Sequence, residues 1–420
     1  MTSTGNATQV TTCRVCGGQD WQPVVSFGDL PLADSFLEPS DSYDAEPRYP
    51  LGVICCRSCR LMSLTHVVDP EVLYRTYPYT TSDSEMMTKH MQRVVEICGD
   101  RFGVTAGSFV VEIGSNTGSQ LKAFQKAGIR TLGIDPALNI VEVARRRGVE
   151  TLPDFFSVET AASVKEKYGA PRLILGRHVF AHIDDISGVV EGVRSMLDPD
   201  GLFAIEVPYV VDMLQRNEFD TIYHEHLSYF GVGTLATLFE RHGLKIVDVE
   251  RLPVHGGSIL VFAGLADGTW ATRPIVEELI AGERAFGLDK DGTYEQFALN
   301  FASIKEELVS LIRGLRADGK RIVGYGAPAK GNTLLNACGL GLDDLEFCSD
   351  TTEFKQGKVL PGTHIPVRAP SEVAVDEVDY YLLLAWNYSE EILKKEQAFL
   401  AKGGRFILPN PTPSVVPSQA

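Results

Sequence analysis

A glycine-bearing turn limits what this chain can fold into more than any other feature of its sequence. The turn Glu112–Gly118, with the sequence EIGSNTG, follows the apolar run Phe109–Ile113 and precedes the helix-forming stretch Ser119–Lys126. Glycine lets the backbone adopt a positive φ and approach a ligand closely. The first turn of a helix offers N–H groups that have no partner within the helix. The segment therefore predicts a strand, a ligand-binding loop and a helix, in that order.

Apolar runs alternate with helix-forming stretches on both sides of this turn. Short strands joined by helices are typical of a parallel, doubly wound sheet, so the middle of the chain is predicted to be α/β. Two later runs, Lys245–Arg251 and Ser258–Ala263, have no helix between them and predict an antiparallel pair. The other predicted strands are Phe109–Ile113, Thr131–Ile134, Arg172–Leu175 and Leu202–Val207, and the predicted helices are Ser119–Lys126, Ala137–Arg147, Ser157–Tyr168 and Asp185–Met196.

The pattern divides the 420 residues into three expected domains. Residues 1–80 are rich in Pro and Asp and contain only short strand-like runs. Residues 81–300 open with a predicted helix at Glu85–Cys98 and hold the doubly wound sheet. Residues 301–420 are expected to form a second, smaller α/β unit of the Rossmann type, with a loose Pro-rich end from Pro409. Its predicted elements are the helices Ser303–Arg316 and Asn332–Ala337 and the strands Arg321–Tyr325, Leu345–Ser349, Tyr380–Ala385 and Arg405–Leu408.

The overall charge and the lack of long apolar runs exclude several classes of partner. A net charge of −16 argues against nucleic acid and anionic lipid, which both need a positive surface. No apolar run approaches the roughly 18 residues of a membrane span, and the polar N-terminus is unlike a secretory signal. A cytoplasmic protein, monomeric or weakly self-associating, is therefore expected. In that compartment the eight cysteines indicate a metal site or free thiols rather than disulfides.

Four of the cysteines form two Cys-x-x-Cys pairs, Cys13 with Cys16 and Cys56 with Cys59. Two such pairs can place four thiolates around one ion, which is the arrangement of a structural zinc site. Cys55 offers a second register, but the spacing favours Cys56. Four sulfurs leave no open position for water, so the zinc is expected to stabilise the N-terminal domain and not to take part in chemistry. Reduced thiols without a metal are the alternative.

The turn differs from that of nicotinamide dinucleotide proteins, in which a second glycine makes room for the pyrophosphate. Asn116 does not supply that glycine. The spacing of Glu112, Gly114 and Gly118 instead resembles the first motif of class I methyltransferases, which binds S-adenosylmethionine. The resemblance implies that Glu112 and the turn residues Gly114, Ser115, Asn116 and Gly118 hold the amino-acid part of this cofactor.

Three further residues complete the expected cofactor site. Asp135 ends the next predicted strand, about 20 residues after Gly114, where a carboxylate can accept hydrogen bonds from both ribose hydroxyls. Asp154 and Phe155 follow the third strand, where this fold usually meets the adenine. The carboxylate of Asp154 can accept from the exocyclic amine, and the ring of Phe155 can stack on the base. As an alternative, Glu112 and Asp135 are helix caps or surface acids.

Two segments rich in histidine and tyrosine follow the fourth and fifth strands, Arg177–His182 (RHVFAH) and Tyr223–Phe230 (YHEHLSYF). Both should flank the methyl group of the cofactor, because the carboxyl ends of parallel strands face the ligand crevice. Methylation of carbon needs a base such as His for a proton beside a carbonyl, and a donor such as Tyr for the enolate oxygen. A metal site and a structural cluster are the alternatives. An extended backbone would place His224 and His226 on one side and Glu225 on the other.

Six motifs occur in a fixed order along nearly the whole chain. In this combination the chain resembles the zinc-containing, S-adenosylmethionine-dependent C-methyltransferases of deoxysugar biosynthesis, and among them the C-3′-methyltransferases of the D-tetronitrose pathway. The resemblance implies methylation at C-3′ of a dTDP-linked 3-amino-4-keto-2,3,6-trideoxyhexose. The motifs are the Cys-x-x-Cys pairs, Glu112–Gly118, Arg177–His182, Tyr223–His226, His255–Ser258 and Gly324–Gly331.

The resemblance also implies roles for four side chains. His226 would be the base that removes the C-3′ proton, and Glu225 would orient or charge its neighbours. Tyr223 and His182 would stabilise the enolate oxygen or relay protons. Related enzymes that act at another carbon would carry much the same motifs. A non-catalytic zinc module with a degenerate methyltransferase fold is disfavoured by the intact pair of Glu112 and Asp135.

The second glycine-bearing turn, Gly324–Gly331, gives the nucleotide of the acceptor an expected place between the second and third domains. Backbone N–H groups at the start of the following helix, together with Lys330, suit a pyrophosphate. Asp350 follows the next strand and keeps a nicotinamide-dependent nucleotide-sugar oxidoreductase open as an alternative function. The expected substrate-binding residues are Tyr77, Tyr79, His255, Tyr325, Lys330 and Asn332.

Overall fold

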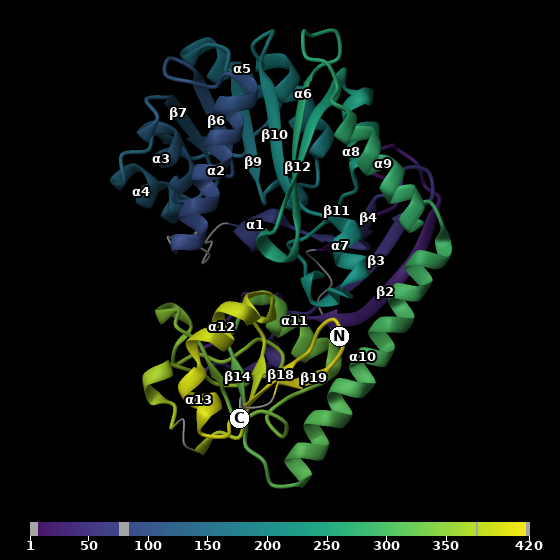
Figure 1. Cartoon of the computed structure of the whole chain (residues 1–420), viewed down its shortest axis with the longest axis vertical. Helices are drawn as coiled ribbons and strands as arrows, with labels where there is room; N and C mark the ends of the chain where they lie inside the picture. Colours follow the sequence, from purple (N-terminus) through teal and green to yellow (C-terminus); the bar gives the residue numbers. More distant parts are fainter. Residues whose placement is uncertain (1–6, 75–83, 375–376, 417–420) are drawn as a thin grey trace.

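The part of the chain that the structure describes contains four β-sheets, of seven, six, four and two strands. The computed structural model describes residues 7–74, 84–374 and 377–416. In Figure 1 a seven-stranded sheet with its helices lies at the top, and a six-stranded sheet lies at the bottom. N-terminal strands and the long helix α10 (Asp291–Ala317) run along the right side, from the first of these sheets to the second.

The seven-stranded sheet has the strand order β12-β13-β10-β9-β6-β7-β8. Its strands from β6 to β10 pair in parallel, and β13 is antiparallel to both of its neighbours. The predicted doubly wound sheet and the predicted antiparallel pair are therefore confirmed. The strands are β6 (Phe109–Ile113), β7 (Arg130–Ile134), β8 (Thr151–Leu152), β9 (Leu173–Arg177), β10 (Leu202–Pro208), β12 (Leu244–Leu252) and β13 (Ser258–Leu265).

Helices cover both faces of this sheet, because successive residues of a strand point to opposite faces. Val110 packs with residues of α2, α3 and α4, whereas Val111 packs with residues of α5, α6 and α8. Polar caps start three of these helices, since the side chains of Ser84, Ser157 and Asp185 accept hydrogen bonds from the first turns of α2, α5 and α6. The helices are α2 (Glu85–Phe102), α3 (Ser119–Lys126), α4 (Leu138–Arg146), α5 (Val158–Tyr168), α6 (Ile186–Met196) and α8 (Val232–Arg241).

The N-terminal part forms a sheet of order β11-β4-β3-β2 and a separate antiparallel pair of β1 and β5. Its edge strand β11 (Ser228–Tyr229) comes from the segment that follows β10, and Ser228 pairs with Ser63. Sequence analysis predicted neither this strand nor its addition to the N-terminal sheet. The other elements are β1 (Ala7–Gln9), β2 (Trp21–Leu30), β3 (Tyr49–Cys56), β4 (Met62–Leu64), β5 (His66–Val68) and α1 (Pro70–Tyr74).

Helix α10 joins the seven-stranded sheet to the six-stranded sheet and packs along β2 (Figure 1). The rings of Phe301 and Phe27 meet edge to face with centroids 5.0 Å apart. Asp291, at the start of α10, forms ion pairs of 2.9 Å with Arg57 and with Arg60. Helix α9 (Pro274–Phe286) precedes it. The domain boundary that we expected at residue 300 falls inside α10.

The six-stranded sheet has the order β16-β15-β14-β17-β18-β19 and is parallel except for β19. Strand β15 is shorter than predicted, and β19 lies in the segment that we expected to be loose. An edge strand needs a partner on one side only, so it tolerates the nearby prolines. The elements are β14 (Ile322–Tyr325), α11 (Ala329–Cys338), β15 (Cys348–Ser349), β16 (Val367–Arg368), β17 (Tyr380–Leu383), α12 (Ser389–Lys395), α13 (Gln397–Ala401), β18 (Arg405–Leu408) and β19 (Ser414–Val416).

The segment that follows β2 reaches across to the six-stranded sheet. Leu37 forms a backbone bridge with Val359. The ring of Tyr43 stacks on that of His364 with centroids 4.0 Å apart. The three parts are thus connected by the pairing of β11 with β4, by α10 and by this segment. Within the described ranges, no helix combines the length and the apolarity needed to cross a membrane.

Candidate active site

A cavity of about 890 Å³ is lined by all three parts of the chain. From the seven-stranded sheet it receives the segments that follow the carboxyl ends of β6, β7, β8, β9 and β10. From the six-stranded sheet it receives Pro328–Lys330, which follow β14, and Asn387 and Tyr388, which follow β17. Parallel sheets bind ligands at the carboxyl ends of their strands. Two such edges therefore share one cavity.

The turn after β6 has the backbone shape that its glycines predicted. Gly114 has a φ of +63°, and a Cβ at this position would lie 2.6 Å from Cγ2 of Val179, which also lines the cavity. Gly118 has a φ of +74° and is the N-cap of α3, where a Cβ would lie 2.7 Å from Val149. Gly118 does not line the cavity, so its contribution is to the shape of the turn. Ser115 and Asn116 both line the cavity.

Glu112 and Ser115 fit a cofactor that carries an amino-acid group. Among the described residues, neither Oε2 of Glu112 nor Oγ of Ser115 has a hydrogen-bond partner, although both atoms are buried. Burial raises the pKa of Glu112 to about 8, and the nearby guanidinium of Arg177 opposes this shift. A buried carboxylate without a partner is costly. An ammonium group placed against Glu112 would supply both the charge and the donors that it lacks.

Asp135, Asp154 and Phe155 continue this wall of the cavity. The two carboxylate oxygens of Asp135 accept hydrogen bonds from the backbone N–H groups of Asn116 (2.9 Å) and Ala137 (3.0 Å). Each oxygen keeps a second lone pair, which suits a ribose hydroxyl. Asp154 is exposed, and 46% of the surface of Phe155 beside it is exposed. An exposed ring there suits stacking on a planar base.

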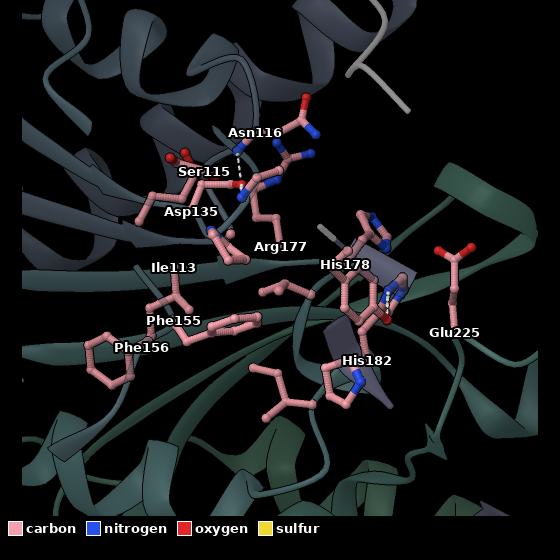
Figure 2. A pocket seen from close by; sticks show the side chains of 18 of the residues that line it. Ile113, Ser115, Asn116, Asp135, Phe155, Phe156, Arg177, His178, His182 and Glu225 are labelled. Atoms are coloured by element: carbon pink, nitrogen blue, oxygen red, sulfur yellow. Dashed lines mark hydrogen bonds between the residues drawn. The ribbon is translucent and has the colours of Figure 1, made fainter. Parts of the chain in front are cut away.

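The opposite wall holds the four side chains that were expected to carry the chemistry. Figure 2 shows Ile113, Phe155 and Phe156 on one side of the pocket and His178, His182 and Glu225 on the other. The rings of His182 and His226 have centroids 5.0 Å apart, and the ring of Tyr223 lies 3.9 Å from that of His226. All four candidates, His182, Tyr223, Glu225 and His226, line the cavity.

Burial disfavours the charged form of both His182 and His226. Burial lowers the pKa of His182 to about 4 and holds the pKa of His226 well below its usual value. Nδ1 of His226 lies 2.7 Å from the carbonyl oxygen of Thr221. A carbonyl only accepts, so the proton of the neutral ring resides on Nδ1 and the lone pair on Nε2. His226 thus presents the tautomer of a base.

The segment around His226 is a turn, which corrects the extended conformation assumed above. The N–H of His226 donates to the carbonyl of Tyr223 (2.9 Å). Glu225 and His226 consequently line the cavity together, whereas His224 is buried with Nε2 3.1 Å from the carbonyl oxygen of Tyr49. The described residues contain one group with metal-ligating geometry, and it is the cysteine quartet. The structure therefore gives no support to a His224–His226 metal site.

Sequence analysis missed a buried polar network beside this wall. Glu206, near the end of β10, is fully buried and contacts His90 (2.8 Å), Arg177 (2.7 Å) and His178 (3.0 Å). Burial raises the pKa of Glu206, but Arg177 and His178 outweigh it and hold the value well below the usual range. Arg177 and His178 line the cavity. A lone carboxylate within the apolar run Leu202–Val207 was the available signal.

The substrate residues expected from the six-stranded sheet are only partly at the cavity. Lys330 lines it, with Nζ 3.6 Å from Glu218 and 5.4 Å from the centre of the Trp386 ring. Asn332 is buried and donates to the carbonyl of Ala33 (3.1 Å). The hydroxyl of Tyr325 donates to Glu396 (2.7 Å). Asn332 and Tyr325 are therefore withdrawn as substrate residues, because neither lines the cavity.

Three other candidates have no place in this description, and one residue was missed. Tyr77 and Tyr79 lie outside the described residues, as does the side chain of His255. Lys355 lines the cavity, and its Nζ donates to the carbonyl of Ala327 (2.8 Å). Lys330 and Lys355 are thus two cations that line the cavity from the side of the six-stranded sheet.

The segment that carries His226 is held by the other two parts of the chain. Strand β11 pairs with β4 of the N-terminal sheet. On the other side, Nε1 of Trp386 donates to Asp220 (2.5 Å). Thr221, which orients His226, directly follows Asp220. The segment that carries His226 thus depends on contacts with both neighbouring parts.

The four predicted zinc ligands come together in the N-terminal part. The sulfurs of Cys13, Cys16, Cys56 and Cys59 all lie within 4.8 Å of one another. A tetrahedral zinc with Zn–S bonds of about 2.3 Å needs sulfurs roughly 3.8 Å apart, so the group fits this ion. Cys55 is fully buried outside the group. The register with Cys56 is therefore the one that the structure shows.

Known proteins resemble the chain in all three parts. Residues 13–74 match a family model described as a zinc binding domain, residues 87–249 a methyltransferase domain, and residues 253–411 a C-methyltransferase C-terminal domain. The protein C-methyltransferase NovU of Streptomyces niveus is 50% identical over 408 residues, which are 97% of this chain and 97% of that protein.

Solved structures resemble smaller shares of the chain. The PH0226 protein of Pyrococcus horikoshii OT3 aligns with 46% of this chain and 97% of its own, at 14% identity and a TM-score of 0.36. Magnesium protoporphyrin IX methyltransferase of Synechocystis PCC 6803 aligns with 44% of this chain and 86% of its own, at 11% identity and a TM-score of 0.33. The family matches, together with the NovU relative, confirm the resemblance inferred from the motifs. The chain belongs to the family of zinc-containing, S-adenosylmethionine-dependent C-methyltransferases.

Proposed function

We propose that the protein methylates C-3′ of a dTDP-linked 3-amino-4-keto-2,3,6-trideoxyhexose in deoxysugar biosynthesis. One observation carries the proposal: a single cavity joins the cofactor turn, the pair His182 and His226, and a second α/β edge with Lys330 and Lys355. The family supports a carbon acceptor. The motif resemblance supports the sugar and the carbon. The deoxysugar would lie at the histidine wall and its nucleotide at the second edge.

His226 would remove the proton from the carbon beside the keto group. The C–H bond breaks, its electron pair forms the enolate, and the proton moves to Nε2 of His226. A buried histidine is a weak base, but the enolate charge that forms beside the ring stabilises the imidazolium. Tyr223 and His182 would donate to the enolate oxygen, and Glu225 would orient these groups. This arrangement is a base with preorganised donors.

S-adenosylmethionine, when bound, supplies a methyl group on a sulfonium that a carbanion can attack. Glu112 would hold its ammonium group, Asp135 its ribose and Phe155 its adenine. The residues that line the cavity would hold the substrate carbon against the methyl donor, and such alignment would provide a large part of the rate. The cysteine-bound zinc lies outside this cavity, since none of its four ligands lines it.

Lys330 and Lys355 would bind the pyrophosphate of the substrate. Lys330 is in the first turn of α11, where backbone N–H groups also favour an anion. Two cations at this place would allow a protein with a net charge of −16 to hold a nucleotide sugar.

The direct test is proton exchange in D₂O with S-adenosylhomocysteine bound, followed by NMR of the product formed with S-adenosylmethionine. We expect deuterium and then a methyl group at C-3′ of the dTDP-sugar. The variant His226→Asn should abolish both, whereas His364→Asn should retain both, because His364 and its partners Tyr43 and Glu46 do not line the cavity. Exchange at the normal rate in His226→Asn would show that another group is the base. A methyl group at a different carbon would leave the base intact and revise the acceptor position.

One observation keeps the oxidoreductase in view. Asp350 accepts hydrogen bonds from the backbone N–H groups of Ala327 (2.6 Å) and Thr352 (2.7 Å), the same pattern that Asp135 forms with its own turn. Asp350 does not line the cavity, however. Calorimetric titration separates the two functions, because binding of S-adenosylhomocysteine without binding of NAD supports the methyltransferase alone.

A further inference from the structure

Arg14 lies in the zinc knuckle Cys13–Cys16, between two of the predicted zinc ligands. Its side chain extends away from the cysteines toward the segments that carry His182 and His226. Only 7% of the side chain is exposed. Its Nη1 donates to the carbonyl of Leu227 (2.9 Å) and to the hydroxyl groups of Ser228 (3.0 Å) and Ser63 (2.8 Å). Its Nη2 forms an ion pair of 2.9 Å with Asp184. One guanidinium thus contacts three separate segments of the chain.

Two of these segments carry the histidines of the cavity wall. Leu227 directly follows His226, and Asp184 is two residues after His182. Asp184 is 56% exposed, so its ion pair with Arg14 is weakened by solvent. The bonds to Leu227 and Ser228 are partly buried and charge-assisted, and such bonds constrain geometry more strongly. Arg14 therefore holds the peptide beside His226 more firmly than the loop beside His182.

The direction of Arg14 is set by its two neighbours. Cys13 is its immediate predecessor, Cys16 follows two residues later, and both sulfurs belong to the zinc group. Zinc that ligates both cysteines fixes the backbone from which Arg14 extends. The N–H of Leu64 also donates to the carbonyl of Leu227 (3.1 Å), so the same peptide is tied to the N-terminal sheet.

We propose that Arg14 is a positioning residue. Because the zinc knuckle fixes its backbone, its side chain holds the peptide beside His226 in place. The inference rests on the proposed role of His226. It means that the zinc site, whose four cysteines do not line the cavity, would still influence the position of His226. Arg14 sets where Nε2 of His226 lies relative to the substrate carbon. A displacement of about 1 Å at such a site costs on the order of 10²-fold in rate.

The test compares Arg14→Met, Arg14→Lys and Arg241→Met in the full-length zinc protein. Arg241 is the matched control, because it also contacts the knuckle, through the carbonyl of Cys16, but reaches neither histidine segment. Arg14→Met should retain zinc and the wild-type affinity for S-adenosylhomocysteine, and should lose about 10- to 100-fold in C–H exchange rate. The loss should fall on kcat and not on KM. Arg14→Lys should recover part of the rate, and Arg241→Met should behave as wild type.

Amide hydrogen exchange provides a readout that does not depend on the substrate. Faster exchange at residues 226–230 in Arg14→Met, with unchanged exchange around Glu112, supports the proposal even if no candidate sugar is turned over. Unchanged exchange at residues 226–230 overturns it, as does an equal loss of C–H exchange in Arg241→Met. Loss of zinc in Arg14→Met also overturns it, because the effect would then be structural. Failure of the wild type to exchange any sugar proton would count against the proposed function alone.

Discussion

The substitution Gly114→Ala tests whether cofactor binding depends on a backbone shape that a side chain excludes. Gly114 has a φ of +63°, and its Cβ would lie 2.6 Å from Cγ2 and 2.9 Å from Cβ of Val179. A left-handed backbone costs alanine about 1–2 kcal/mol. An extra carbon forced into packed surroundings costs about 1–3 kcal/mol. Restoring the native turn in this variant therefore costs about 2–5 kcal/mol.

This cost should appear as weaker binding of S-adenosylhomocysteine, because the native turn lines the cofactor side of the cavity. A free energy of about 2–5 kcal/mol corresponds to a Kd raised by about 30-fold to about 4,000-fold, which calorimetry can measure. Gly128→Ala is the matched control, since its φ is +75° and the nearest atom, Cβ of Ala106, is 3.5 Å away. Gly128→Ala should bind as wild type. An unchanged Kd in a folded Gly114→Ala protein would refute the reasoning.

Burial raises the pKa of Glu112 from 4.5 to about 8, so the folded protein without cofactor loses stability as the pH rises between these values. Glu112→Gln should remove this pH dependence of the unfolding free energy. Urea unfolding across that range measures the loss, and a profile identical to wild type would contradict the burial argument. Cys56→Ser should lose zinc while Cys55→Ser keeps it, and metal analysis decides between the two registers; zinc loss in both would show that Cys55 matters too. Glu206→Gln should cost about 3–5 kcal/mol of stability, because it removes the buried negative charge that pairs with Arg177. Glu250→Gln is the control, because the ion pair of Glu250 with Arg101 is partly exposed, and it should cost less than about 1 kcal/mol. Equal losses of stability in the two variants would contradict the argument from the burial of Glu206.

The central strands were the most predictable elements. The predicted bounds Phe109–Ile113 coincide with those of β6, since all five residues are buried, as a central parallel strand requires. Strand β11 has only two residues and no recognisable pattern. It forms because Met62 and Ser63, far away in the chain, offer a backbone to pair with. Local sequence contains no information about such a partner.

The candidate site was predictable where chain order alone places a residue at a strand end, as for Asp135. It was not predictable where side-chain direction decides. Asn332 lies two residues after Lys330 on α11, and two residues correspond to about 200° around a helix. When Lys330 faces the cavity, Asn332 must face away, against Ala33. His224 was misplaced for a similar reason, because a turn replaces the expected extended chain.

The contact between Trp386 and Asp220 has a consequence for how the cavity responds to a local disturbance. Trp386 follows β17 of the six-stranded sheet, whereas the turn Glu112–Gly118 belongs to the seven-stranded sheet. A loosening of the six-stranded sheet would therefore disturb the segment that carries His226 and leave the turn that faces the cofactor in place.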